Sequence, residues 1–166
     1  MAKTDYVYYD TADVGTTANT DINFFSRSEG GSGRAITNLE TANEIPVGQV
    51  FTLNEIHIFT TGDVAGDDVY EIMEEGILEI LISGNRKFIS PALLCATSSH
   101  YYIAVQDKTD ATQLAFGTPT GGPYKFEKPL VIKGGENFRV IFRTGTTTPG
   151  DGAEVVIALR GEIEGR

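Results

Sequence analysis

The chain has 166 residues, of which 40% are hydrophobic and 22% charged, and this length and composition suit one globular core without metals or disulfides. Its 13 Lys and Arg residues are scattered and its formal net charge is −10, which argues against the basic surface that nucleic acids and anionic membranes require. A single cysteine cannot form an internal disulfide, and no segment approaches the roughly 20 apolar residues of a membrane helix. We therefore expect a soluble protein made in a cytoplasm.

The first part of the chain, residues 1–46, is rich in Thr, Asn, Asp, Gly and Ser and holds two short apolar islands, Tyr6–Tyr9 and Ile22–Phe25. The stretch Glu29–Arg34 has the composition of a flexible linker. Such a zone cannot bury enough apolar surface to offset the entropy lost on ordering. We expect residues 1–46 to be an extended arm that docks its islands on its own sandwich or on a neighbouring chain. Ile22, Phe24 and Phe25 are expected to be partner-binding anchors of the arm, in a contact with a neighbouring chain.

From residue 47 onward, apolar and polar residues alternate with a period of two, the pattern of strands with one buried face. Because turn residues separate nearly all of these segments, the pattern predicts an antiparallel sandwich or barrel of short strands. In chain order, the expected strands are Val50–Leu53, Glu55–Phe59, Asp68–Ile72, Ile77–Ile82, Lys87–Ile89, His100–Gln106, Gln113–Phe116, Tyr124–Phe126, Asn137–Arg143 and Glu154–Ile163.

Two local features interrupt the alternation. The apolar positions change parity between Leu53 and Ile56, which predicts a β-bulge near Asn54 or Glu55. A short helix is expected over Ser90–Ala96, with Ser90 as its N-cap and proline at its first helical position.

No motif predicts a phosphate or metal site. The glycines of Glu29–Arg34 lack the Gly-Lys-Ser/Thr ending of a phosphate-binding loop. His57 and His100 are the only histidines and lie in separate expected strands, so a catalytic metal would have to recruit carboxylates. The acidic turn Asp63–Asp68 could supply oxygen ligands to calcium, but it lacks the alternating ligand spacing of a calcium loop. We expect no metal and no cofactor.

Catalytic signals are equally weak. Cys95 lies in an apolar stretch and is expected to be a small buried hydrophobic residue rather than a nucleophile. No Gly-x-Ser-x-Gly elbow is present, and no Ser or Cys lies beside a local base. We therefore expect no enzymatic activity and no catalytic residue.

One segment resembles a known class of proteins. In Gly121–Phe142 a Pro-Leu pair is followed by Gly-Gly-Glu-x-Phe-x-Val, which is similar to the late strands of tailed-phage and marine-phage virion proteins. The terminal strand of such proteins resembles Val155–Gly161. Their openings are similar to Asn23–Phe25, Glu29–Gly33 and Ile45–Phe51.

The resemblance implies an all-β fold: a single jelly-roll type antiparallel β-sandwich over residues 47–166, preceded by the extended N-terminal arm of residues 1–46. It also implies a capsid decoration (cement) protein on the exterior of the virion. Its partners would be the major capsid protein and copies of itself, as a trimer, with no nucleic acid and no membrane.

Two other functions stay open. One is a jelly-roll capsid subunit that forms the lattice itself. The other is a carbohydrate-binding or receptor-binding module of a fibre or surface protein, in which exposed aromatic rings stack on sugars. The candidate platforms for such stacking are Tyr6, Tyr8, Tyr9, Tyr102 and Tyr124.

Overall fold

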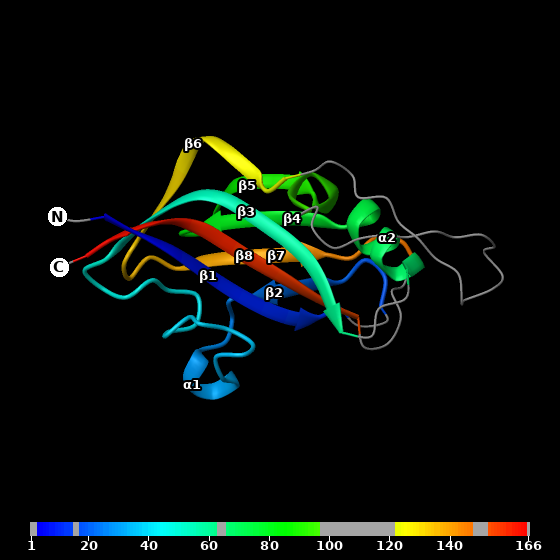
Figure 1. The fold of residues 1–166 in the computed structure, drawn as a ribbon, viewed down its shortest axis with the longest axis horizontal. Helices are drawn as coiled ribbons and strands as arrows, with labels where there is room; N and C mark the ends of the chain where they lie inside the picture. Colours follow the sequence, from blue (N-terminus) through cyan, green and yellow to red (C-terminus); the bar gives the residue numbers. More distant parts are fainter. Residues whose placement is uncertain (1–2, 15–16, 63–65, 97–121, 148–152, 166) are drawn as a thin grey trace.

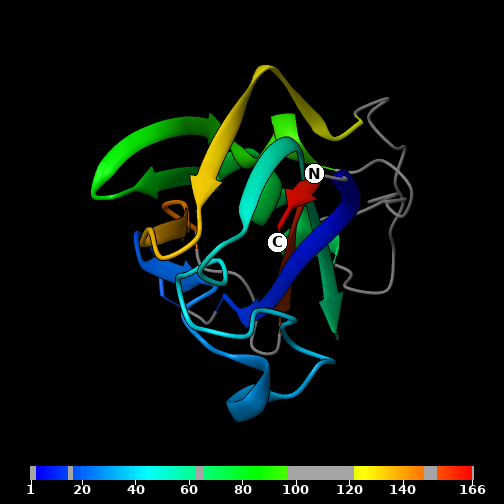
Figure 2. The same ribbon diagram turned by 90° about the vertical axis from the view of Figure 1, so that its left-hand side faces the viewer.

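The computed structural model of the chain describes residues 3–14, 17–62, 66–96, 122–147 and 153–165 (Figure 1). In chain order the elements are β1 (Lys3–Asp13), β2 (Asp21–Phe24), α1 (Glu29–Ser32), β3 (Val50–Gly62), α2 (Gly66–Glu75), β4 (Ile77–Ile82), β5 (Asn85–Pro91), the 3-10 helix η1 (Ala92–Cys95), β6 (Tyr124–Lys133), β7 (Phe138–Arg143) and β8 (Ala153–Glu164). The strands form two four-stranded sheets, β1-β8-β3-β6 and β2-β7-β4-β5, which pack as the two layers of a sandwich (Figures 1 and 2).

The strand pairing is nested. Antiparallel pairs form between β1 and β8, β2 and β7, β3 and β6, and β4 and β5, as if one long hairpin had been rolled up. Successive pairs fall into alternate sheets, and further pairings of β3 with β8 and of β4 with β7 complete each sheet. This is the topology of a jelly roll. The expected all-β, jelly-roll sandwich is therefore confirmed.

The N-terminal residues belong to this roll. β1 pairs with β8 along its whole length, from Lys3 opposite Glu164 to Asp13 opposite Glu154, and β2 pairs with β7. The division expected at residue 46 therefore differs from the structure, in which two of the sandwich strands precede that position. The entropy argument treated the polar zone as an isolated segment, whereas edge strands take their backbone hydrogen bonds from a neighbour and need few apolar residues.

The core lies between the sheets and follows the expected alternation in β4, β7 and β8. Outward side chains such as Arg139 and Arg143 are exposed. The inward residues of these strands with no exposed surface are Leu78, Ile80, Phe138, Val140, Phe142, Ala153, Val155, Ile157 and Leu159. The hydrophobic alternation thus identified the buried face of these three strands.

The predicted bulge is confirmed. The register of β3 shifts between Leu53 and Glu55 against both neighbours. Against β8 the partners are consecutive, Gly161 and Arg160, so Asn54 is the extra residue, whereas against β6 the residues 126–129 are the extra ones. Gly161 lies opposite Leu53, and a Cβ at position 161 would lie 2.0 Å from the Thr52 carbonyl oxygen. Only glycine allows the two strands to approach this closely beside the bulge.

Two expected elements differ from the structure. Residues 68–72, expected as a strand, lie in α2, which lies at one end of the sandwich and buries Ile72 and Met73 (Figure 1). A five-residue apolar alternation is too short to distinguish a strand from a helix. The expected helix over 90–96 is confirmed only as the single turn η1, because Ser90 and Pro91 remain in β5.

β6 extends from the expected 124–126 to Lys133, and the strands expected at 100–106 and 113–116 lie outside the described residues.

Within the described part of the chain, no helix combines the length and the apolar character needed to span a bilayer.

Candidate functional site

The outer face of the sheet β2-β7-β4-β5 combines arginines with aliphatic side chains. The strand register places Leu81 between Arg86 and Arg139, and places Ile77 beside Arg143. In the next row, Glu79 lies between Ile89 and Ile141. We name this surface the arginine face and define it by Arg86, Arg139, Arg143, Ile77, Leu81, Ile89 and Ile141.

Each guanidinium of the arginine face is held by a residue of a neighbouring strand. Arg143 donates from Nε and Nη2 to the two carboxylate oxygens of Asp21, at 2.6 and 3.0 Å. Arg139 Nη2 donates to Asn23 Oδ1 at 2.6 Å, and Arg86 Nε donates to Glu79 Oε2 at 3.1 Å. The bond from Arg143 lowers the pKa of Asp21, which therefore stays ionised at neutral pH. A guanidinium has five N–H donors, so each arginine retains donors for a further partner.

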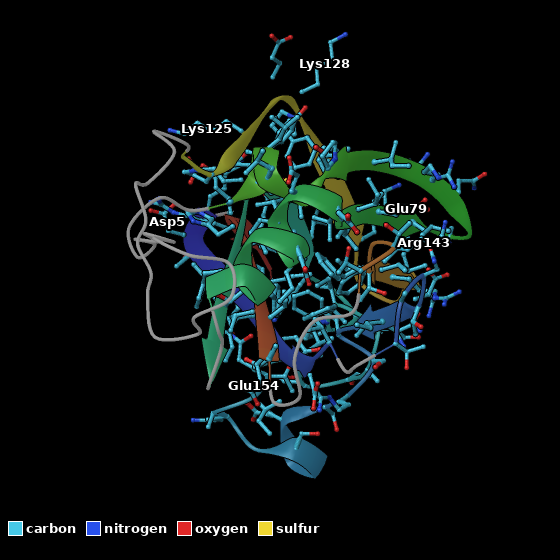
Figure 3. The ribbon with its side chains drawn as sticks, turned by 90° about the vertical axis from the view of Figure 1, so that its right-hand side faces the viewer. Asp5, Glu79, Lys125, Lys128, Arg143 and Glu154 are labelled. Carbon is cyan, nitrogen blue, oxygen red and sulfur yellow. The ribbon has the colours of Figure 1, made fainter. Side chains whose placement is uncertain are left out.

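The arginine face differs in charge from the rest of the chain. Together with its charged neighbours Lys87, Asp21 and Glu79, the face holds four cations and two anions and so carries +2, which leaves −12 for the remainder of a chain whose net charge is −10. Figure 3 shows Glu79 and Arg143 on one flank of the molecule and Asp5 on the opposite flank.

The other sheet carries an apolar groove on its own outer face. The groove encloses about 460 Å³, within the range of small-molecule sites. Tyr9 is held at its wall, because its hydroxyl donates to the Arg34 carbonyl oxygen at 2.5 Å. We name this feature the outer groove; its lining residues are Val7, Tyr9, Thr11, Ala35, Phe59, Glu154, Val156 and Ala158.

A buried carboxylate joins β1 to the segment that follows β2. The side chain of Asp10 has no exposed surface and accepts a hydrogen bond from the Phe25 N–H at 2.6 Å. Arg27 Nη2 lies 3.4 Å from Asp10 Oδ1. Burial raises the pKa of Asp10, although the Phe25 N–H and Arg27 act in the opposite direction. Phe25 has a φ of 58°, which is costly for a bulky residue, and the bond to Asp10 holds it there.

The expected arm anchors lie in this chain's own core. Phe24 and Phe25 have 0% exposed surface, and the Phe25 ring lies 5.7 Å from that of Phe138. Ile22 is partly buried against the same core. The sequence pattern predicts that these residues bind a neighbouring chain, whereas their own chain covers both phenylalanines completely and leaves no surface on either for a neighbour.

The other candidate residues are dispersed. His57 Nε2 lies 3.4 Å from Glu55, whose carboxylate also pairs with Lys125 and Arg160 at the surface. Within the described ranges, no group of three or more His, Cys, Asp or Glu side chains is arranged to hold a metal. His100 and residues 63–65 of the acidic turn lie outside those ranges.

Cys95 is buried, as expected for a small hydrophobic residue. Burial raises the pKa of its thiol to about 12, so the thiol stays protonated at neutral pH. Because the thiolate is the reactive form, Cys95 is unsuited to nucleophilic chemistry in this environment.

Most of the candidate aromatic platforms are packed against other rings. Tyr8 is 3% exposed and makes an edge contact with Phe51, and the ring centroid of Tyr6 lies 4.7 Å from that of Tyr8. Tyr124 packs 4.8 Å from Phe88. Tyr102 lies outside the described residues, and Tyr9 lines the outer groove.

The comparisons with known proteins assign no family. A scan against protein-family models finds no match, and a search of curated proteins finds no relative. The functional interpretation therefore depends on the surfaces of the sandwich.

Proposed function

We propose that the chain is a non-enzymatic structural protein of a phage virion, which decorates the outside of the capsid and stabilises the shell through protein–protein contacts. The late strands and the opening of the chain resemble those of phage virion proteins, and the jelly-roll sandwich is the fold that this resemblance implies. Its partners are the major capsid protein and further copies of the chain, and it acts on the capsid exterior.

The observation that carries the proposal is the presence of apolar side chains on the outer faces of both sheets. Ile89 on the arginine face is 52% exposed, and Val7 at the outer groove is 40% exposed. A protein that reinforces a shell must contact at least two neighbours, and the two opposite faces provide two chemically different surfaces. Outer sheet faces that serve only to contact water are normally polar.

The test is binding to the particle. Purified virions of the phage that carries the gene are analysed for the chain, and empty shells are mixed with the pure protein and sedimented. We expect the protein to sediment with shells and to saturate at a fixed number of copies per shell. Absence from purified virions together with no binding to empty shells would refute the proposal. Closed shells formed by the pure protein alone would instead favour the lattice-forming capsid subunit.

One observation favours a carbohydrate-binding module as a second candidate. Tyr9 presents a held aromatic ring in the outer groove, where Thr11 and Glu154 supply polar atoms. Sugars bind proteins by stacking on rings while carboxylates and hydroxyls orient them. A glycan array would test this function: binding that Tyr9→Ala abolishes and Val131→Ala leaves unchanged would favour it over decoration.

A further inference from the structure

We propose that the arginine face binds an acidic surface of a second copy of this chain. The inference rests on the proposed function, which counts further copies of the chain among its partners, and it names the surface through which two copies meet. Because self-association is a property of the pure protein, its failure is distinguishable from a failure to bind shells. It rests on three features of the face: its aliphatic surface, its held arginines and its charge.

The arginine face exposes aliphatic side chains between its charged ones. Ile77, Leu81 and Ile141 are partly exposed, and Ile141 of β7 lies diagonal to the other two, which flank Glu79 on β4. Ile89 of the edge strand β5 lies opposite Glu79 and is 52% exposed. Exposed aliphatic side chains rimmed by polar residues mark interaction sites in soluble proteins.

The arginine side chains are held in place by hydrogen bonds before any partner binds. Arg143, Arg139 and Arg86 are each bonded to a residue of an adjacent strand, so binding restricts their side chains less than it would restrict free ones. Arginine on an aliphatic background is enriched in protein–protein contacts, where lysine is depleted.

Charge identifies the occupant. The arginine face with its charged neighbours carries +2 and the rest of the chain −12, so a second copy is strongly negative outside this face. A two-fold pairing of arginine faces would oppose cations to cations, which disfavours a symmetric dimer. The contact therefore joins unlike surfaces of two copies, and such a contact closes into a ring or continues as a filament.

The test is the mass of the pure protein by sedimentation equilibrium between about 1 µM and about 200 µM. We expect assemblies larger than two copies of the 17.9 kDa chain, which dissociate as salt rises from about 0.05 M to about 0.5 M. Arg139→Glu and Ile89→Glu should each weaken association at least about tenfold. Both residues are exposed, so the variants should fold, and far-ultraviolet circular dichroism checks this.

Matched controls lie away from the arginine face. Val131→Glu introduces the same charge at a 48% exposed aliphatic residue on the edge strand β6, and Arg34→Glu reverses a cation whose side chain is 82% exposed. Both should associate like the wild type. A monomeric wild type, or variants of the arginine face that associate as well as the controls, would overturn the inference. A monomeric chain that needs Arg139 to bind shells would show that the occupant is the capsid protein, which also overturns it.

Discussion

Replacing Phe24 by alanine tests whether the N-terminal segment belongs to the sandwich. Phe24 ends β2, lies opposite Val140 of β7 and has 0% exposed surface. Truncating a fully buried phenylalanine costs about 3–5 kcal/mol, because transfer energy is lost and a cavity remains. For a chain of this size, each kcal/mol lowers Tm by about 2–4 °C, so we expect Tm to fall by roughly 10 °C. Phe24 is preferred to Phe25, whose strained backbone would complicate the comparison.

The assays are thermal and urea denaturation at low protein concentration, so that self-association does not contribute to the free energy of unfolding. The chain has no tryptophan, so far-ultraviolet circular dichroism is the suitable probe. Val47→Ala is the control, because Val47 is 86% exposed and exposed substitutions change stability by less than about 0.5 kcal/mol. If Phe24→Ala is as stable as Val47→Ala, then Phe24 is not buried in its own chain and the placement of β2 is wrong.

Three further predictions concern single residues. Gly161→Ala should lower the free energy of unfolding by about 1–3 kcal/mol, because the added Cβ would lie 2.0 Å from a carbonyl oxygen of β3. Gly30→Ala is the control, since its Cβ would have nothing within 4 Å, and it should not lose stability in a thermal melt. The pKa of Asp10 is raised from 3.8 by burial, so folded protein binds this proton more tightly than unfolded protein does. The stability of the wild type relative to Asp10→Asn should therefore fall as pH rises through the raised pKa; a rise in urea titrations from pH 4 upward would contradict this. Cys95 should react with a thiol reagent only after denaturation, and rapid labelling of native protein would show that its burial is wrong.

The hydrophobic alternation predicted the parts of the fold in which one strand face is fully buried. Inward residues of β4, β7 and β8 follow a period of two with few exceptions, and the parity change around Asn54 locates the bulge without a partner strand. The sequence did not predict β1 as a strand of the sandwich, because β1 is an edge strand and one of its inward residues is the charged Asp10. In the sequence, an aspartate indicates a solvent-exposed segment. Only the hydrogen-bond partners that the fold supplies show that this carboxylate is buried.

The arginine face could not be predicted because no continuous motif encodes it. Arg86, Arg139 and Arg143 stand on two strands that lie about 50 residues apart in sequence, and only the register of β4 between β5 and β7 brings them together. Each arginine taken alone is an ordinary outward residue of a strand. The sequence pattern indicates the strands themselves but does not indicate which strands pair with each other.

The pairing of β1 with β8 has a consequence for synthesis of the chain. β1 is made before β8, which is its partner strand in the sheet, while the backbone of β1 also bonds to residues 36–38; Figure 2 shows the two marked ends of the chain near each other. Until β8 has been made, the backbone groups of β1 that face it lack their sheet neighbour, and an unpaired strand can associate with other nascent chains. The roll therefore cannot close before β8 has been synthesised, and the yield of native protein should decrease when expression is fast and the temperature high.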